Sequence, residues 1–284
     1  MFEMLFENQK GQQLSFGEDS PFTITAFEGL NPPTATINTN AAALMDGATF
    51  NSSKLNVRSM NIAFVIQRNA EENRLAVYKV IQAKKPLRIY YKSDLLDLYI
   101  DGYVESVNVG HWEKKQTVTV SILCPSPFFK AAQEVINGLW AVIPRFTFPF
   151  ASTAEPELVF GEIDPQASAY VQNDGNVETG LIFELYARRA VSNPKIYNYI
   201  TNEFIELNFE MQTGDFITIA TGQGEKTVTL LRDATESNIF NCLNKNSTWL
   251  QLDVGESVFV YTIGEGNLTD LSINIRHSDL YEGV

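Results

Sequence analysis

The sequence predicts a mainly β protein with two β domains. Short runs alternate between apolar and polar residues, as in Phe22–Ala26 and Met60–Ile66, with the period of two of a half-buried strand. Turn residues separate the runs of the second half roughly every 8–12 positions, which is typical of a sandwich or jelly roll. The length of 284 residues fits two ordinary domains better than one.

Two hairpins are expected in the first half. Leu5–Glu7 and Gln13–Phe16 flank the turn signal Asn8–Gly11. Tyr99–Val109 and Gln116–Cys124 form a longer pair that closes around a polar turn. Both pairs predict antiparallel neighbours in one sheet.

Two helices are also expected there. Asn69 is placed to cap a helix, with Glu72 in the reciprocal position of a capping box. Lys84–Pro86 ends this helix, because proline cannot continue it and the basic pair suits the helix dipole. Phe128–Leu139, which follows two prolines, is predicted as a second helix.

Strand patterns dominate the second half, after an entry segment punctuated by Pro144, Pro149 and Pro156. The expected strands are Leu158–Ile163, Ala169–Gln172, Leu181–Ala187, Ile196–Ile200, Phe204–Phe209, Phe216–Thr221, Thr227–Leu231, Trp249–Leu252, Val258–Thr262 and Leu271–Arg276.

Charge supports a domain boundary near residue 145. Residues 1–145 contain 14 Lys/Arg and 14 Asp/Glu and are neutral, whereas residues 146–284 contain 7 and 20 and carry the whole net charge of −13. The acidic half would repel phosphates, which argues against binding nucleic acid or an anionic membrane there. The expected domains are therefore 1–145 and 146–284. It is open whether residues 276–284 stay with the second domain or return to the first.

Residues 38–55 differ from the strands around them, because they have little periodicity and little bulk. The segment predicts an extended arm or hairpin with its turn at Asp46-Gly47. A segment that buries little by itself often lies on another surface. A mobile surface loop is an equally good interpretation at this point.

No catalytic constellation is evident. Gly222–Thr227 resembles a phosphate-binding loop, but Glu225 replaces its second glycine, and a strand pattern follows, so a hairpin turn is predicted. His111 and His277 are the only histidines, and neither has a second metal-type ligand four residues away. No enzyme activity, cofactor or metal is therefore expected.

Cysteines and aromatic residues also favour packing roles. Cys124 and Cys242 are too few for a disulfide framework or a metal cage, and both are interpreted as small buried hydrophobes. Some aromatic residues could line a sugar-stacking groove, but sandwich core is favoured. These residues are Tyr197, Tyr199, Trp249, Phe259 and Tyr261.

Neither the start of the sequence nor its interior suggests membrane targeting. The first ten residues lack the basic and apolar regions of a secretory signal. No run approaches the ~18–20 apolar residues that span a bilayer. Synthesis in a cytoplasm is expected.

Several segments, in their order along the chain, resemble the distal tail proteins of siphoviruses, the siphophage tail component family. The similarity spans nearly the whole chain, and one departure is Glu256, in a turn. The matching segments are Phe22–Pro33, Asp46-Gly47 with Arg58–Ile66, Arg74–Tyr91 with Ile100–Glu105, Val120–Phe129, Asn173–Gly180, Gly214-Asp215, Leu252–Glu256 and Ile275–Val284.

The resemblance implies a fold and a role. The first domain would be a β-sandwich or split barrel with one or two helices, resembling tail-tube proteins, and the second a galectin-like jelly-roll sandwich. Six copies would form a ring with a central channel for DNA, at the tip of the virion tail of a phage or prophage. The arm at about 38–55 would be the belt that laps the neighbouring subunit. The implied ring-interface residues are Asn38, Ala42, Leu44, Met45, Asp46, Gly47, Phe50 and Leu55.

The implied partners are further copies of the chain, the major tail tube protein, the tape-measure protein, and the tail hub with its tail-associated lysin or tail fibre. Sequence-specific nucleic acid and membrane are not among them. A carbohydrate-binding module that contributes to host adsorption is the alternative function, and it predicts exposed coplanar aromatic residues on the second domain. A glycosidase ranks third, since its carboxylate pair is defined by a separation that sequence does not give.

Overall fold

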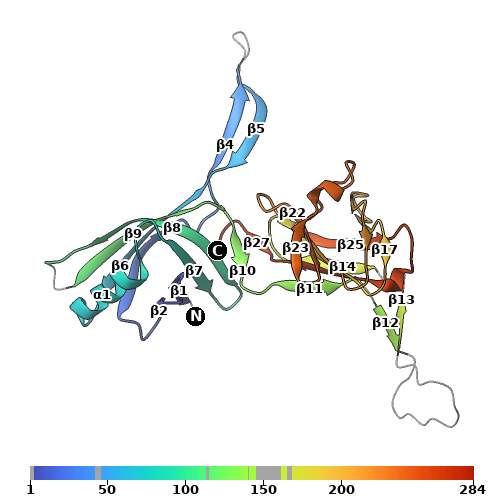
Figure 1. Ribbon diagram of the computed structural model, residues 1–284. Helices are drawn as coiled ribbons and strands as arrows, with labels where there is room; N and C mark the ends of the chain where they lie inside the picture. The colour runs from blue at the N-terminus through green and yellow to red at the C-terminus, as the bar shows by residue number, and fades with distance from the viewer. Residues whose placement is uncertain (1–2, 42–45, 113–114, 140, 145–160, 165–167) are drawn as a thin grey trace. The chain divides into compact units, whose positions relative to one another are not determined.

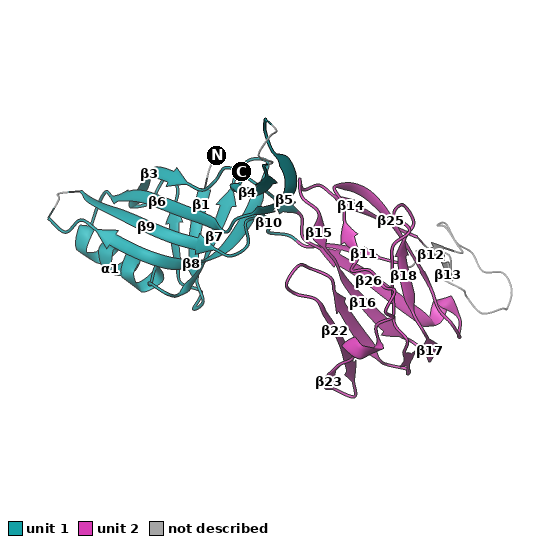
Figure 2. Cartoon of the chain, turned by 90° about the horizontal axis from the view of Figure 1, so that it is seen from above, with its two compact units in different colours: residues 1–133, 280–284 teal, residues 134–279 magenta. Residues whose placement is uncertain are grey.

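The computed structural model describes residues 3–41, 46–112, 115–139, 141–144, 161–164 and 168–284 (Figure 1). It has two compact units, residues 1–133 with 280–284 (unit 1) and residues 134–279 (unit 2), coloured separately in Figure 2. Unit 1 contains 13 Lys/Arg and 14 Asp/Glu, a net charge of −1, and unit 2 contains 8 and 20, a net charge of −12. The uneven charge seen in the sequence therefore follows the two units.

Unit 1 is built on one antiparallel sheet with the strand order β2-β1-β7-β8-β9-β6-β3. Its strands are β1 (Glu3–Asn8), β2 (Gln13–Phe16), β3 (Phe22–Glu28), β6 (Arg58–Ile66), β7 (Pro86–Lys92), β8 (Asp97–Val109) and β9 (Gln116–Cys124). Both predicted hairpins are confirmed, as β1-β2 and β8-β9. Two short strands, β10 (Phe129–Ala131) and β27 (Leu280–Tyr281), pair with each other, and β10 also pairs with β8.

The two edges of this sheet approach each other inside the core. Phe16 on edge strand β2 lies 5.8 Å from Phe22 on edge strand β3, measured between ring centroids. Phe64 on β6 lies 5.0 Å from Phe16, and all three rings are buried. Of the two folds expected for this domain, β-sandwich and split barrel, a single sheet whose edges share one core corresponds to the split barrel.

The helix α1 (Ala70–Val80) starts where Asn69 predicts it and buries Val77 and Val80. The predicted capping box is wrong, because the Asn69 side chain makes no capping hydrogen bond and its backbone is left-handed, with φ of 49°. The side chain of Asn73 instead donates to the Arg68 carbonyl oxygen at 2.7 Å.

The second predicted helix, Phe128–Leu139, is wrong. These residues form β10 and then β11 (Val135–Gly138), which pairs with β26 (Leu271–His277) of unit 2. The backbone groups of this segment form hydrogen bonds with neighbouring strands instead of within a helix. Pairing with these strands therefore outweighs the helix-like spacing of the apolar residues. The same pairing explains why the units divide at 133/134 and not at 145/146. Residues 145–160, which hold most of the expected entry segment, lie outside the described residues.

Unit 2 is a two-layer antiparallel sandwich. One layer has the strand order β11-β26-β16-β21-β22-β23, and the other has the order β14-β25-β18-β19. Phe183 of the first layer and Phe259 of the second meet in its core, with ring centroids 6.0 Å apart. The remaining strands of the layers are β14 (Ala169–Asn173), β16 (Ile182–Ala187), β18 (Lys195–Asn198), β19 (Phe204–Glu206), β21 (Phe216–Ala220), β22 (Thr227–Arg232), β23 (Thr235–Asn238) and β25 (Gly255–Thr262).

Three strand pairs and two short helices complete unit 2. The pairs are β12 (Ala141–Pro144) with β13 (Gly161–Asp164), β15 (Thr179–Gly180) with β24 (Gln251–Leu252), and β17 (Val191–Ser192) with β20 (Glu210–Met211). The 3-10 helices are η1 (Phe240–Cys242) and η2 (Leu268–Asp270). The fold class predicted from the sequence, two mainly β domains, is confirmed.

Candidate functional site

The arm is the most distinctive surface of unit 1. It consists of β4 (Ala35–Asn40) and β5 (Thr49–Leu55), which pair only with each other. Figure 1 shows this hairpin standing away from the unit 1 sheet. Asp46 and Gly47, the expected turn residues, form a bend ahead of β5, and Gly47 has a φ of +87°, which favours glycine.

Among the residues that the structure describes, no second layer covers the arm. Every residue of β5 is exposed, and Phe50 and Ile37 are 67 % and 63 % exposed. Its polar side chains bond within the hairpin, as where Asn38 Nδ2 donates to Ser52 Oγ at 3.0 Å. An isolated two-stranded hairpin is marginal in water, so the pairing of β4 with β5 contributes little by itself to holding the arm in place.

The sequence-predicted interface residues fall on this hairpin where the structure describes them. Asn38, Asp46, Gly47, Phe50 and Leu55 lie on its strands or turn, and Phe50 is the most exposed of its bulky apolar side chains. Three further residues lie outside the described part of the chain: Ala42, Leu44 and Met45.

Arg58 is buried at the root of the arm, with only 3 % of the residue exposed, and it anchors this root. Its Nη1 donates to the carbonyl oxygens of Gly29 and Asn31 at 2.5 and 2.8 Å, and its Nε donates to the Pro127 oxygen at 2.8 Å. Its Nη2 donates to the carbonyl oxygen of Glu282. Burial lowers the pKa of Arg58 from its ordinary value. The guanidinium therefore joins three separate backbone segments through four carbonyl oxygens.

The final segment of the chain completes this anchor. The Val284 amide donates to the Leu30 carbonyl oxygen at 3.2 Å. A Cβ on Gly283 would lie 3.0 Å from Pro32 Cδ, so a larger residue would crowd the root. Residues 280–284 thus return to unit 1, which the sequence leaves open, and they hold the segment that leads into the arm.

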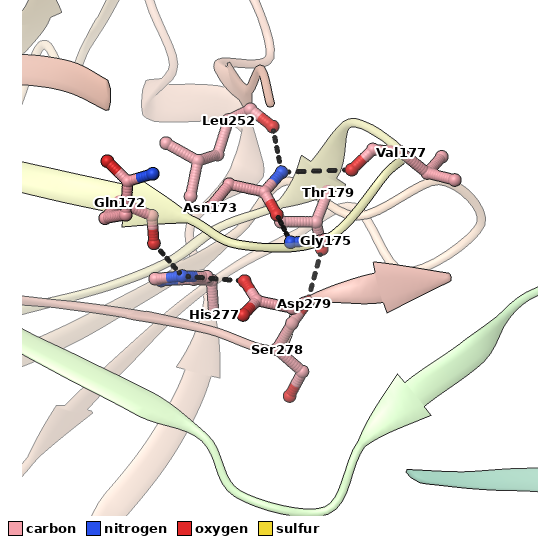
Figure 3. Close-up of polar contacts among 9 residues, drawn as sticks. All are labelled: Gln172, Asn173, Gly175, Val177, Thr179, Leu252, His277, Ser278 and Asp279. Atoms are coloured by element: carbon pink, nitrogen blue, oxygen red, sulfur yellow. Dashed lines mark hydrogen bonds and ion pairs between the residues drawn. The ribbon is translucent and has the colours of Figure 1, made fainter. Parts of the chain in front are cut away.

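A second buried polar cluster lies at Asp279, the last residue of unit 2 (Figure 3). His277 Nε2 lies 3.1 Å from the Gln172 carbonyl oxygen and 3.3 Å from Asp279 Oδ1. Because a carbonyl oxygen only accepts, Nε2 carries a proton. Burial raises the pKa of the Asp279 carboxyl above its ordinary value, and the nearby His277 opposes that rise.

Backbone carbonyls and amides surround this pair, as Figure 3 shows. The Thr179 hydroxyl donates to the Ser278 oxygen at 2.8 Å. The Asn173 side chain donates to the Leu252 oxygen at 3.1 Å and accepts from the Gly175 amide at 2.9 Å. These bonds satisfy backbone groups and hold the chain where it leaves unit 2, which is a structural task.

The other residues singled out in the sequence lie apart. His111 is exposed near the tip of the β8-β9 hairpin, and Gly222–Thr227 forms the predicted turn between β21 and β22. Cys124 is buried as predicted, and burial raises its pKa to about 12, whereas Cys242 is only half-buried. In the part of the chain that the structure describes, no group of three His, Cys, Asp or Glu is placed to hold a metal ion.

The core prediction for the aromatic residues of unit 2 is partly wrong. Phe259 and Tyr261 are buried, and Trp249 packs half-buried against the core. Tyr197 faces the opposite side, because Ile196 and Asn198 occupy the inward positions of β18, and Tyr199 is 68 % exposed in the turn that follows this strand. Alternation places the two tyrosines on one face, but it does not say which face is buried.

Comparisons with known proteins agree with this architecture. The family model of the phage tail protein RIFT-related domain matches residues 9–124. The model of the siphovirus-type tail component, C-terminal domain, matches residues 174–276, so the two together cover more than half of the chain. No curated protein matches the sequence.

Two solved structures share the fold. The crystal structure of the Dit protein (gp 19.1) of phage SPP1, described as a paradigm of the hub adsorption apparatus in phages that infect Gram-positive hosts, has a TM-score of 0.69 at 13 % identity, over 99 % of each chain. A chain of the phage P2 baseplate in its activated conformation with Ca has a TM-score of 0.52 at 11 % identity, over 100 % of each chain. At these identities the likeness concerns the fold.

The fold and the matched domains define a structural component of a phage tail. The chain belongs to the siphovirus-type tail component family, that of the distal tail proteins. Among the described residues, no helix has the length and apolar character needed to cross a membrane.

Proposed function

We propose that six copies of this chain close into a ring at the tail tip, and that each arm laps onto the neighbouring subunit. The observation that carries the proposal is the arm itself, whose apolar side chains Ile37 and Phe50 have no partner layer within the described hairpin. The family's role as a tail component and the fold shared with a baseplate chain support it.

Ring closure has a simple physical basis. A surface that binds a different surface on the next copy generates a ring when the rotation between copies closes. The arm and the sheet-bearing body of unit 1 are two such surfaces. The net charge of −1 on unit 1 lets copies approach through it without strong repulsion, whereas unit 2 at −12 would be repelled.

The ring would enclose a channel for DNA and join the tail tube to the hub and receptor-binding apparatus. DNA passes freely only if the wall lacks cations that hold phosphates. On β6 and β9, the side chains facing away from the core include Asn61, Thr119 and Ser121, which are uncharged. This composition supports a channel wall on that face, and a ring structure with a channel lined by Lys and Arg would refute the proposal.

Light scattering behind a sizing column, with negative-stain imaging of the peak, tests the assembly. Six copies weigh about 191 kDa against 31.8 kDa for one chain, and the images should show rings with a central hole. A peak that stays at the mass of one chain, even with purified tail tube protein present as a template, would contradict the proposal.

A further inference from the structure

The outer face of the four-stranded layer of unit 2 is unusually apolar. Strands β14, β25, β18 and β19 each turn alternate residues inward to the core. The outward positions at the centre of the layer carry large apolar side chains, here called the tyrosine face. Its members are Tyr170, Tyr197, Phe204, Val258 and Val260 on the strands, with Tyr199 in the turn directly after β18.

Strand register makes the tyrosine face continuous. Tyr170 pairs with Val258, and the Tyr199 amide donates to the Val258 carbonyl oxygen at 2.7 Å. Tyr197 lies between Val260 on one side and Phe204 on the other. Tyr170 and Tyr199 are 64 % and 68 % exposed. The six side chains therefore form one apolar patch across four strands.

The outer face of the other layer is mixed, with one paired apolar row of Tyr186, Phe216 and Leu231 and a polar centre. At its centre, Glu184 on β16 pairs with Asn274 on one side and Thr218 on the other, and Arg276 Nη1 donates to Glu184 Oε1 at 2.5 Å. A sheet with one solvated face normally presents such polar residues outward. The centre of the tyrosine face is apolar instead, and exposed apolar patches with polar edges are typical of binding sites.

The charged residues around the tyrosine face indicate which kind of partner it can bind. Exposed Glu256 adjoins Val258 on β25, and exposed Glu203 precedes Phe204. Lys195, a nearby cation on this face, has its Nζ over the Phe204 ring at 3.8 Å. A second copy would bring like charges together, because unit 2 carries −12. The edge is complementary to lysine or arginine.

We propose that the tyrosine face docks another protein of the tail tip, one that presents an apolar surface bordered by basic side chains. The inference rests on the proposed function, because a ring would display six such faces and bind its partner with sixfold multiplicity. Aromatic residues at the centre and charged residues at the edge are the composition of a protein–protein interface. A glycan fits less well, because two valines separate the rings and saccharide sites need convergent polar groups in a hollow.

The test measures binding of the full-length chain to the purified hub protein and to the purified receptor-binding protein of the same tail, each alone. The variant is Tyr170→Ser with Tyr199→Ser, and the matched control is Tyr186→Ser, an exposed tyrosine on the outer face of the other layer. We expect one of the two proteins to bind, the double variant to weaken binding by about tenfold or more, and the control to leave it unchanged. Added salt should weaken wild-type binding, since the edge is charged.

Unchanged binding by the double variant, or binding by neither protein, would overturn the proposal. So would binding of soluble host-wall polysaccharide that the double variant loses, which would make the face a glycan platform. Light scattering on the same samples separates the two proposals. A double variant that still forms rings but no longer binds its partner would support the docking proposal. A chain that never forms rings but binds its partner through the tyrosine face would refute only the proposal of the ring.

Discussion

Strands β5 and β6 are neighbours in the sequence and differ in what covers them. Both belong to antiparallel ladders, and that of β5 has one register shift between Asn38 and Thr39 of its partner. In β6 alternate side chains are buried against a shared core, whereas in β5 every residue is exposed. The comparison teaches that backbone pairing shapes both strands but that only β6 has a second layer within the described chain. The free energy that holds the arm in place therefore comes from its root and, in the proposed ring, from the neighbouring subunit.

The largest expected effect comes from removing a core ring. Phe64 on β6 is fully buried among Phe16 and Phe22. Phe64→Ala leaves a cavity and should lower the free energy of unfolding by about 3–5 kcal/mol. Chemical denaturation followed by circular dichroism measures it. A loss below about 1 kcal/mol would mean that this part of the sheet lacks the packed core described here.

Removing the Arg58 side chain at the root of the arm should lower the free energy of unfolding somewhat less. Arg58→Ala leaves four carbonyl oxygens without their donor and should lower the free energy of unfolding by about 3 kcal/mol. The control is Arg88→Ala, which removes an exposed ion pair with Asp101 and should cost less than about 1 kcal/mol. Equal losses in the two variants would argue against the anchoring role of Arg58.

The buried carboxyl of unit 2 gives a smaller, pH-dependent effect. Because burial raises the pKa of Asp279 above its ordinary value of 3.8, the folded state binds this proton more tightly than the unfolded state. The contribution of Asp279 to stability therefore increases as the pH falls through the raised pKa toward the ordinary value of 3.8, and decreases as the pH rises. Denaturation of wild type and Asp279→Asn should be measured across this range. As the pH falls, the free energy of unfolding of the wild type should rise relative to that of the variant, by less than the loss caused by Arg58→Ala. A constant difference would contradict the assignment.

The smallest change in stability should come from the arm. Phe50→Ala removes the same ring as Phe64→Ala, but from a side chain that is 67 % exposed. The free energy of unfolding of the single chain should change by less than about 0.5 kcal/mol. Measured at a concentration too low for association, a loss comparable to that of Phe64→Ala would show that the arm packs on its own unit.

Local patterns predict much of this fold. Alternation and turn residues give the hairpins β1-β2 and β8-β9 and most strands of unit 2, and the weak periodicity of residues 38–55 singles out the arm. The prediction fails where distant pairing decides the outcome, as at Phe128–Leu139. Tyr197 and Tyr199 were assigned to the wrong face for the same reason, because alternation has no absolute orientation.

The sequence does not predict the buried polar contacts of Arg58 and His277. Arg58 bonds to Glu282, 224 residues away, and His277 bonds to Gln172, 105 residues away. Nothing local distinguishes these side chains from solvent-exposed ones except that Arg58 opens a strand whose alternate positions are all buried. That position in the alternation is the one signal that could have identified it.

The most direct measurement compares the mass of the wild-type chain in solution with that of the double arm variant Ile37→Ser with Phe50→Ser. We expect about 191 kDa for the wild type and 31.8 kDa for the variant, with the same free energy of unfolding for each unit. A variant that still assembles into rings of six would contradict the claim that the exposed arm holds neighbouring subunits together.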